Sequence, residues 1–342
     1  MDMGYPVSST KQNNWISIHM LTPIAGKDYP RNWNQFVEWF STEEACLDYV
    51  ERLRWPDGFT CPACGVQAEP YRASRLRLMC RHCHHQTSVT TGTIFEKTRT
   101  PMKVWLAAAW YTTNQKLGVS ALGLQRVLGL GSYQTAWTIL HRFRRAMVRP
   151  ERDKLHGLVE VDETYMPITD RQPADSSKGR KSNTNRVLVV MAVEIHEPKG
   201  FGRIRLRRIV DDSAASVIPF VSDVVASEAI VRTDGSTAYI SLKDQGFSHE
   251  RKVMLGAENP AHVTMPGVHR IASLLKRWML GTHQGAVQAE QLDFYLDEFV
   301  FRFNRRSSSS RGMLFYRLME QAVRTPPVTY ADVAQKKRPA RR

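Results

Sequence analysis

The sequence lacks long apolar runs and a secretory start, and it has few cysteines. No apolar run approaches the roughly 20 residues needed to cross a bilayer. The first 35 residues have no basic start followed by an apolar segment, which is the mark of a secretory signal. We therefore expect a cytoplasmic protein. Of its five cysteines, four form two Cys-x-x-Cys pairs, which in a reducing compartment predicts a metal site rather than disulfides.

Acidic residues are also in short supply. The 342 residues include 33 Asp and Glu against 48 Lys and Arg, a formal net charge of +15. This excess predicts a polyanionic partner. A membrane surface is the weaker interpretation, because no long basic amphipathic helix has an apolar face free of other contacts. The length allows two or three domains, one of them large enough to bury a core.

The two cysteine pairs predict one structural zinc ion. Cys61 and Cys64 are separated from Cys80 and Cys83 by 15 residues, and each pair can form a tight turn around a tetrahedral ion. A shell of four sulfurs leaves no open position for substrate. The segment is too short for a core of its own, so zinc would supply much of its folding free energy. The alternative is four unligated cysteines.

A helix-turn-helix pattern follows the cysteine region. Residues 120–128 and 132–148 have helical spacing and are joined by the turn 129–131. The second helix has a polar and basic face, which favours contact with a DNA groove. The alternative is an ordinary helical hairpin with a solvated face. The candidate DNA contacts on this helix are Gln134, Thr138, Arg142 and Arg145.

After residue 150 the pattern changes to mixed α/β. Two strand-like runs, 158–162 and 229–234, each end in a carboxylate, Asp162 and Asp234. Carboxylates at strand ends suit phosphodiester chemistry, in which two divalent ions about 3.5–4 Å apart stabilise the attacking and leaving oxygens. Mg²⁺ or Mn²⁺ would be the ions. The alternative for each aspartate alone is a place in a surface loop.

Two further candidates lie on the helical pattern 268–278. His269 is a third candidate metal ligand, and Lys276 follows seven positions later, so both side chains share one helix face. The lysine can neutralise a phosphate, and the imidazole can bind a metal or transfer a proton. A structural histidine and a solvated lysine are the alternatives. Glu163 should point to the opposite face of its strand from Asp162, and we do not count it as a ligand.

Several motifs together resemble the ISXO-like insertion-sequence transposases, which carry a zinc ribbon and a DDE-type, RNase H-like catalytic domain. The resemblance covers about residues 36–323 and rests on residues 61–64, 80–83, 159–165, 233–235, 274–278 and 295–306. It implies that Asp162 and Asp234 match the first two acidic positions of the catalytic set, and that Lys276 matches a basic residue after the third. At the third position the broader class carries Glu, whereas this sequence has His269.

The resemblance and the patterns above give a multidomain α/β fold. We expect these parts: an arm over 1–33, a helix and zinc ribbon over 34–98, a helical helix-turn-helix region over 99–150, an RNase H-like catalytic domain over 151–325, and a basic tail over 326–342. Further DNA contacts are expected from Arg277, Arg305 and the polar loop with Lys178, Arg180 and Lys181.

The expected function is that of a DNA transposase. It would bind the terminal repeats of an insertion sequence and target DNA as a homodimer or larger assembly, near the bacterial nucleoid and without a membrane. It would cut and join strands with two catalytic ions. The alternative is a catalytically inactive, transposase-derived DNA-binding protein or repressor, which the missing third carboxylate motivates.

Overall fold

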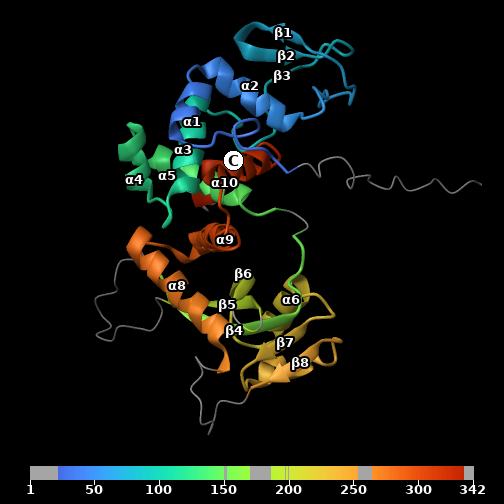
Figure 1. The fold of residues 1–342 in the computed structure, drawn as a ribbon, viewed down its shortest axis with the longest axis vertical. Helices are drawn as coiled ribbons and strands as arrows, with labels where there is room; N and C mark the ends of the chain where they lie inside the picture. Colours follow the sequence, from blue (N-terminus) through green and yellow to red (C-terminus); the bar gives the residue numbers. More distant parts are fainter. Residues whose placement is uncertain are drawn as a thin grey trace, which may run out of the picture.

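The computed structural model describes residues 22–149, 152–169, 186–196, 198, 200–252 and 264–334. Within these ranges the chain forms a small zinc ribbon, a helical module and a mixed α/β domain (Figure 1). No helix in the described ranges is both long enough and apolar enough to cross a membrane.

The helical module gathers helices from both ends of the sequence. Its core joins Phe36, Trp105, Phe143 and Phe315, all buried. The zinc ribbon packs on the same core, because Cys61 and Cys80 belong to that cluster. The helices of the module are α1 (Trp33–Trp39), α2 (Glu43–Arg54), α3 (Met102–Asn114), α4 (Ala121–Leu128), α5 (Tyr133–Ala146), α10 (Arg311–Ala322) and α11 (Tyr330–Ala334).

The expected helix pair is present as α4 and α5, and local chemistry explains its ends. Ser120 caps α4 by accepting the N–H of Gly123, and Ser132 caps α5 by accepting the N–H of Gln134. Between the helices, Gly129 has φ +62°, a left-handed conformation that glycine adopts without strain.

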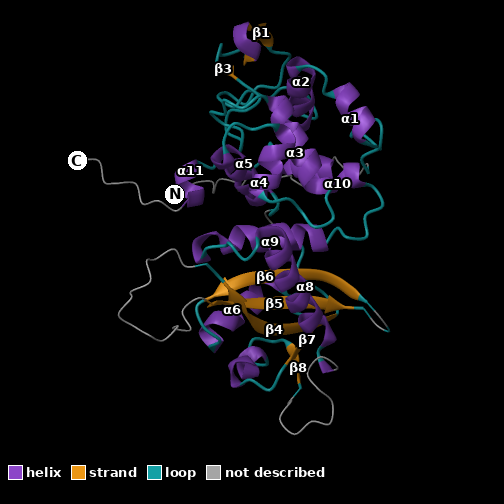
Figure 2. Ribbon diagram, turned by 90° about the vertical axis from the view of Figure 1, so that its left-hand side faces the viewer, coloured by secondary structure: helices purple, strands orange, loops and turns teal. Residues whose placement is uncertain are grey.

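The mixed sheet has the strand order β6-β5-β4-β7-β8. The strands are β4 (Leu158–Pro167), β5 (Arg186–Ile195), β6 (Phe201–Ile209), β7 (Ile230–Thr233) and β8 (Ser248–Arg251). β5 is antiparallel to both of its neighbours, whereas β4, β7 and β8 run parallel. Helix α6 (Ala214–Val224) covers one face, and α8 (Pro266–His283) and α9 (Leu292–Phe303) cover the other (Figure 2). The expected multidomain α/β architecture, a mixed sheet preceded by a ribbon and a helical region, is confirmed.

One detail of the sheet differs from the expectation. Asp162 does not end its strand but lies in the middle of β4, which continues to Pro167. The reason is the unequal pairing of β4. Its pairing with β7 ends at Glu160, whereas its pairing with β5 continues to Pro167. Asp162 therefore lies where β7 has left β4 but β5 still supports it. Asp234 does follow directly after its strand.

The helical module and the sheet domain meet through α9, which lies between them in both views (Figures 1 and 2). The buried carboxylate of Glu298 on α9 accepts from Arg144 of α5 at 2.8 Å and from Arg302 at 2.8 Å. After α9 the chain returns to the helical module, where Phe315 and Leu318 of α10 join the core. The domain bounds expected from the sequence stay a prediction, and residues 311–322 pack on the helical module although they follow the sheet.

Candidate active site and zinc ribbon

The four cysteines come together at the tip of the ribbon. Their Sγ atoms all lie within 4.8 Å of one another, with Cys61 and Cys83 at 3.6 Å and Cys64 and Cys80 at 3.7 Å. A tetrahedral zinc with Zn–S bonds of about 2.3 Å places its sulfurs roughly 3.8 Å apart, so the cluster fits zinc. The three short strands beside it are β1 (Tyr71–Ala73), β2 (Arg77–Met79) and β3 (Gln86–Thr87).

The two aspartates occupy matching places on neighbouring parallel strands. Glu160 of β4 lies opposite Arg232 of β7, the last pair between these strands, and Asp162 and Asp234 each follow that pair by two residues. Side chains two residues apart on a strand share a face. Asp162 accepts the N–H of Glu163 at 2.8 Å, and Asp234 accepts the N–H of Ser236 at 2.9 Å. Each carboxylate is thus oriented by local backbone.

Burial and neighbouring negative charges both act on the carboxyl of Asp162. Burial raises the pKa of its carboxyl to about 6, and the negative charges of Asp234 and Glu160 add to this effect, although the hydrogen bond from Glu163 opposes it. A carboxylate held beside others of the same charge is stabilised by a nearby cation.

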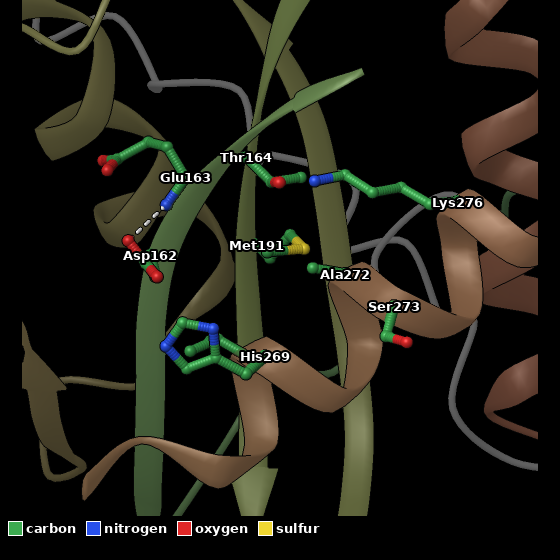
Figure 3. A pocket seen from close by; sticks show the side chains of 9 residues that line it. Asp162, Glu163, Thr164, Met191, His269, Ala272, Ser273 and Lys276 are labelled. Carbon is green, nitrogen blue, oxygen red and sulfur yellow. Dashed lines mark hydrogen bonds between the residues drawn. The ribbon is translucent and has the colours of Figure 1, made fainter. Parts of the chain in front are cut away.

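Helix α8 brings the other two candidates to Asp162. Asp162, His269 and Lys276 line one pocket of about 520 Å³, together with Glu163, Thr164, Met191, Val268, Ala272 and Ser273. In Figure 3 the ring of His269 lies next to Asp162, while the side chain of Lys276 extends toward Thr164. Asp234 is not among the residues that line this pocket. Three of the four predicted residues therefore share a pocket, and the fourth lies at the end of the neighbouring strand.

The three candidate ligands do not form a closed shell. Within the described part of the chain, the four cysteines are the only group of three or more His, Cys, Asp or Glu residues gathered closely enough to be recognised as a metal cluster. Asp162, Asp234 and His269 are not gathered as closely as the four cysteines of the ribbon.

Glu163 occupies the opposite face of the sheet from Asp162, as the strand period predicts. Its carboxylate accepts from the hydroxyl of Tyr239. Burial raises the pKa of Glu163 to about 7, an effect that the Tyr239 hydrogen bond opposes and the charges of Asp162 and Asp234 reinforce.

The candidate DNA contacts are placed unevenly. Gln134, Arg145 and Arg277 are exposed, and Thr138 is partly exposed. Arg142 instead turns inward and donates to the carbonyl of Ile94 at 2.8 Å, and Arg305 stacks over Phe301 at 4.1 Å. The expectation that Arg142 faces outward was therefore wrong: α5 packs that side against the loop before α3. Lys178, Arg180 and Lys181 lie outside the described residues.

Sequence reasoning missed Glu160. This residue is fully buried on β4, on the same face as Asp162. Its carboxylate accepts the N–H groups of Gly267 and Val268, in the first turn of α8. A charged residue between Val159 and Val161 in a buried strand was the available signal, because such a charge requires a partner.

Comparisons with known proteins match two parts of the chain. Residues 154–304 match the model of the ISXO2-like transposase domain, and residues 41–86 match that of the transposase zinc-ribbon domain. An uncharacterized protein in transposable element ISH50 of Halobacterium salinarum is 28% identical over 285 residues, covering 78% of this chain and 92% of the relative.

Two solved structures are similar at low scores. The catalytic core domain of BIV integrase has a TM-score of 0.27 and 17% identity, over 41% of this chain and 80% of that chain. A pre-cleavage Mos1 transpososome has a TM-score of 0.26 and 14% identity, over 63% and 74%. The family resemblance rests on the sequence matches. With a match to a transposase zinc ribbon ahead of a match to an ISXO2-like transposase domain, the chain is similar to the ISXO2-like transposases in both parts.

Proposed function

We propose that this protein cuts DNA at the ends of an insertion sequence and joins the cut strand to target DNA, in a reaction that requires divalent metal ions. The observation that supports this most directly is the pair Asp162 and Asp234. Each follows the last pair between two adjacent parallel strands by two residues, and burial, reinforced by the charge of Asp234, raises the pKa of Asp162 to about 6. Carboxylates paired in this way suit a cation bound to oxygen ligands.

The donor set fits Mg²⁺ or Mn²⁺. Asp162 and Asp234 would hold two ions, and His269 would contribute a nitrogen ligand, which suits Mn²⁺ better than Mg²⁺. When bound, such ions stabilise charge on the attacking and leaving oxygens of an in-line displacement.

The chemistry itself is two displacements at phosphorus. In the first, water attacks the phosphodiester at the element end, a P–O bond forms, and the bond to the 3′ oxygen breaks and leaves a 3′-hydroxyl. In the second, that hydroxyl attacks a target phosphodiester, so one P–O bond replaces another and no external energy source is needed. Lys276 would neutralise the reacting phosphate, and His269, which lies beside Asp162 in Figure 3, would accept a proton.

DNA recognition would belong to the upper half of the molecule in Figure 1. The zinc ribbon and the exposed face of α5, with Gln134 and Arg145, would bind the terminal inverted repeats. Arg277 beside the pocket would contact target DNA. Because two ends must be joined in one event, we propose a homodimer or larger assembly on DNA, acting in the cytoplasm at the nucleoid.

A cleavage and joining assay on end DNA tests this function. The parent should nick the DNA and form strand-transfer products only with Mg²⁺ or Mn²⁺. Asp162→Ala and Asp234→Ala should each lose several kcal/mol of charge stabilisation, which lowers the cleavage rate on the order of 10³-fold or more. Both variants should bind the ends nearly as well as the parent. Full activity in either variant would refute the assignment. A parent that binds ends but never cuts them would instead support the inactive DNA-binding protein.

A further inference from the structure

Glu160 connects the strand of Asp162 to the helix of His269. It lies two residues before Asp162 on the same face of β4, and none of its side chain is exposed. Its Oε2 accepts the N–H of Gly267 at 2.7 Å and the N–H of Val268 at 3.1 Å. These are the last two residues before His269. One carboxylate thus binds the unsatisfied backbone donors with which α8 begins.

The contact is so close that any side chain at Gly267 would have to displace its neighbours. A Cβ atom on Gly267 would lie 2.8 Å from Oε2 of Glu160 and 2.5 Å from Cδ1 of Ile195. Both distances are shorter than real Cβ contacts allow. The first turn of α8 therefore packs directly against the sheet, and this packing distance sets the distance between His269 and Asp162.

The other oxygen of Glu160 faces the second aspartate strand. Oε1 lies 3.8 Å from Nη1 of Arg232, whose Nε donates to Glu250 of β8 at 2.9 Å. Among the described residues this oxygen has no hydrogen-bond partner. Arg232 is on β7, two residues before Asp234. Glu160 therefore touches all three elements that carry the candidate site, β4, β7 and α8.

From this geometry we infer that Glu160 is a positioning residue of the active site, which holds α8 where His269 and Lys276 face Asp162. It binds neither metal nor DNA itself. This inference rests on the proposed function and adds to it a residue that acts through others. Groups that orient metal ligands typically change activity or metal affinity about 10–100-fold when removed.

The chain offers a matched control in Glu194 on β5. Glu194 is also buried, accepts the N–H groups of His156 and Arg203, and pairs with an arginine side chain at 2.7 Å. A glycine, Gly202, lies against it just as Gly267 lies against Glu160. Its hydrogen bonds within the described residues go to His156 and Arg203 and not to α8, so it reports on the loss of a buried carboxylate and its ion pair away from α8.

The experiment compares Glu160→Ala, Glu160→Gln and Glu194→Ala with the full-length parent. Without DNA or metal, amide hydrogen exchange in residues 264–275 should accelerate at least tenfold in Glu160→Ala and stay near the parent in Glu194→Ala. Glu160→Gln keeps one acceptor oxygen, so it should keep most of the protection. In the Mn²⁺-dependent assay, Glu160→Ala should lose about 100-fold in cleavage and need more Mn²⁺ for half-maximal rate, with partial rescue in Glu160→Gln.

Parent-like exchange in the first turn of α8, or parent-like cleavage in Glu160→Ala, would overturn the inference. An equal loss of cleavage in Glu194→Ala would do the same, because it would show a general loss of stability. If Glu160→Ala does not fold, Glu160→Gln decides by its Mn²⁺ requirement, which must rise. If the parent itself never cuts DNA, the proposed function fails, while the exchange measurement still decides whether Glu160 holds α8.

Discussion

The zinc ribbon and the candidate active site of this protein are built in opposite ways. The ribbon's ligands come from two short turns, 15 residues apart in sequence, and their sulfurs close on one another. The candidate active-site residues come from β4, from the residue after β7 and from α8, and three of the four line one pocket. A closed shell of soft ligands stabilises a fold, whereas an open site of oxygen ligands leaves room for a substrate. We therefore expect substitutions in the ribbon to unfold it, and substitutions in the pocket to lower the cleavage rate.

Removing one ribbon ligand should have the largest effect. Structural zinc contributes about 10–16 kcal/mol of apparent binding free energy in zinc-finger peptides, so Cys80→Ser should lose its zinc and unfold the ribbon. Metal analysis should show one zinc ion per chain in the parent and almost none in the variant. Hydrogen exchange should accelerate across residues 59–87 but not across 158–167.

The matched control for this prediction is the fifth cysteine. Cys46 is fully buried in the same helical core but lies outside the zinc cluster. Cys46→Ala should keep its zinc. Zinc lost equally from both variants, or a pocket that unfolds together with the ribbon, would show that the two sites are not built independently.

How far each site can be predicted from sequence follows the same contrast. The ribbon ligands lie close in the chain, so their spacing alone predicts the cluster. The pocket was predicted in part: the strand period separates Asp162 from Glu163, and the helix period brings His269 and Lys276 to one face. Pairing between distant strands decides the rest. It places Asp162 in mid-strand and Glu160 under α8, and no local pattern contains that information.

A buried group of ion pairs lies where the helical module meets the sheet domain, and it offers a test of stability rather than of chemistry. Glu298 is buried between Arg144 and Arg302. Burial alone would raise its pKa, but the charges of Arg302 and Arg144 prevail and lower it to about 2. Glu298→Gln leaves buried arginines unpaired and should cost about 3–5 kcal/mol in free energy of unfolding at pH 7. Urea denaturation would measure this.

The lowered pKa of Glu298 predicts how the stability difference between the parent and Glu298→Gln changes with pH. A carboxyl whose pKa is lower in the folded protein stabilises it above the unfolded pKa and loses that contribution as the pH falls through the folded one. The difference between parent and Glu298→Gln should thus be constant from pH 7 to about 4.5 and shrink toward pH 2. The control is Glu320, whose side chain is 17% exposed and pairs with the more exposed Arg317 and Arg324. Glu320→Gln should cost under about 1 kcal/mol, and equal losses would contradict the role of burial.

The smallest expected effect concerns the departure of this chain from the acidic pattern. An imidazole at position 269 suits Mn²⁺ better than Mg²⁺, because Mg²⁺ prefers oxygen ligands. His269→Glu should therefore raise the ratio of Mg²⁺-supported to Mn²⁺-supported cleavage, on the order of tenfold for about 1.4 kcal/mol of changed ion preference. Rates with each ion at saturation measure it, and His269→Gln controls for the loss of the ring. An unchanged ratio would mean that His269 does not bind the ion, and would leave it the proton-transfer role that its place beside Asp162 also allows.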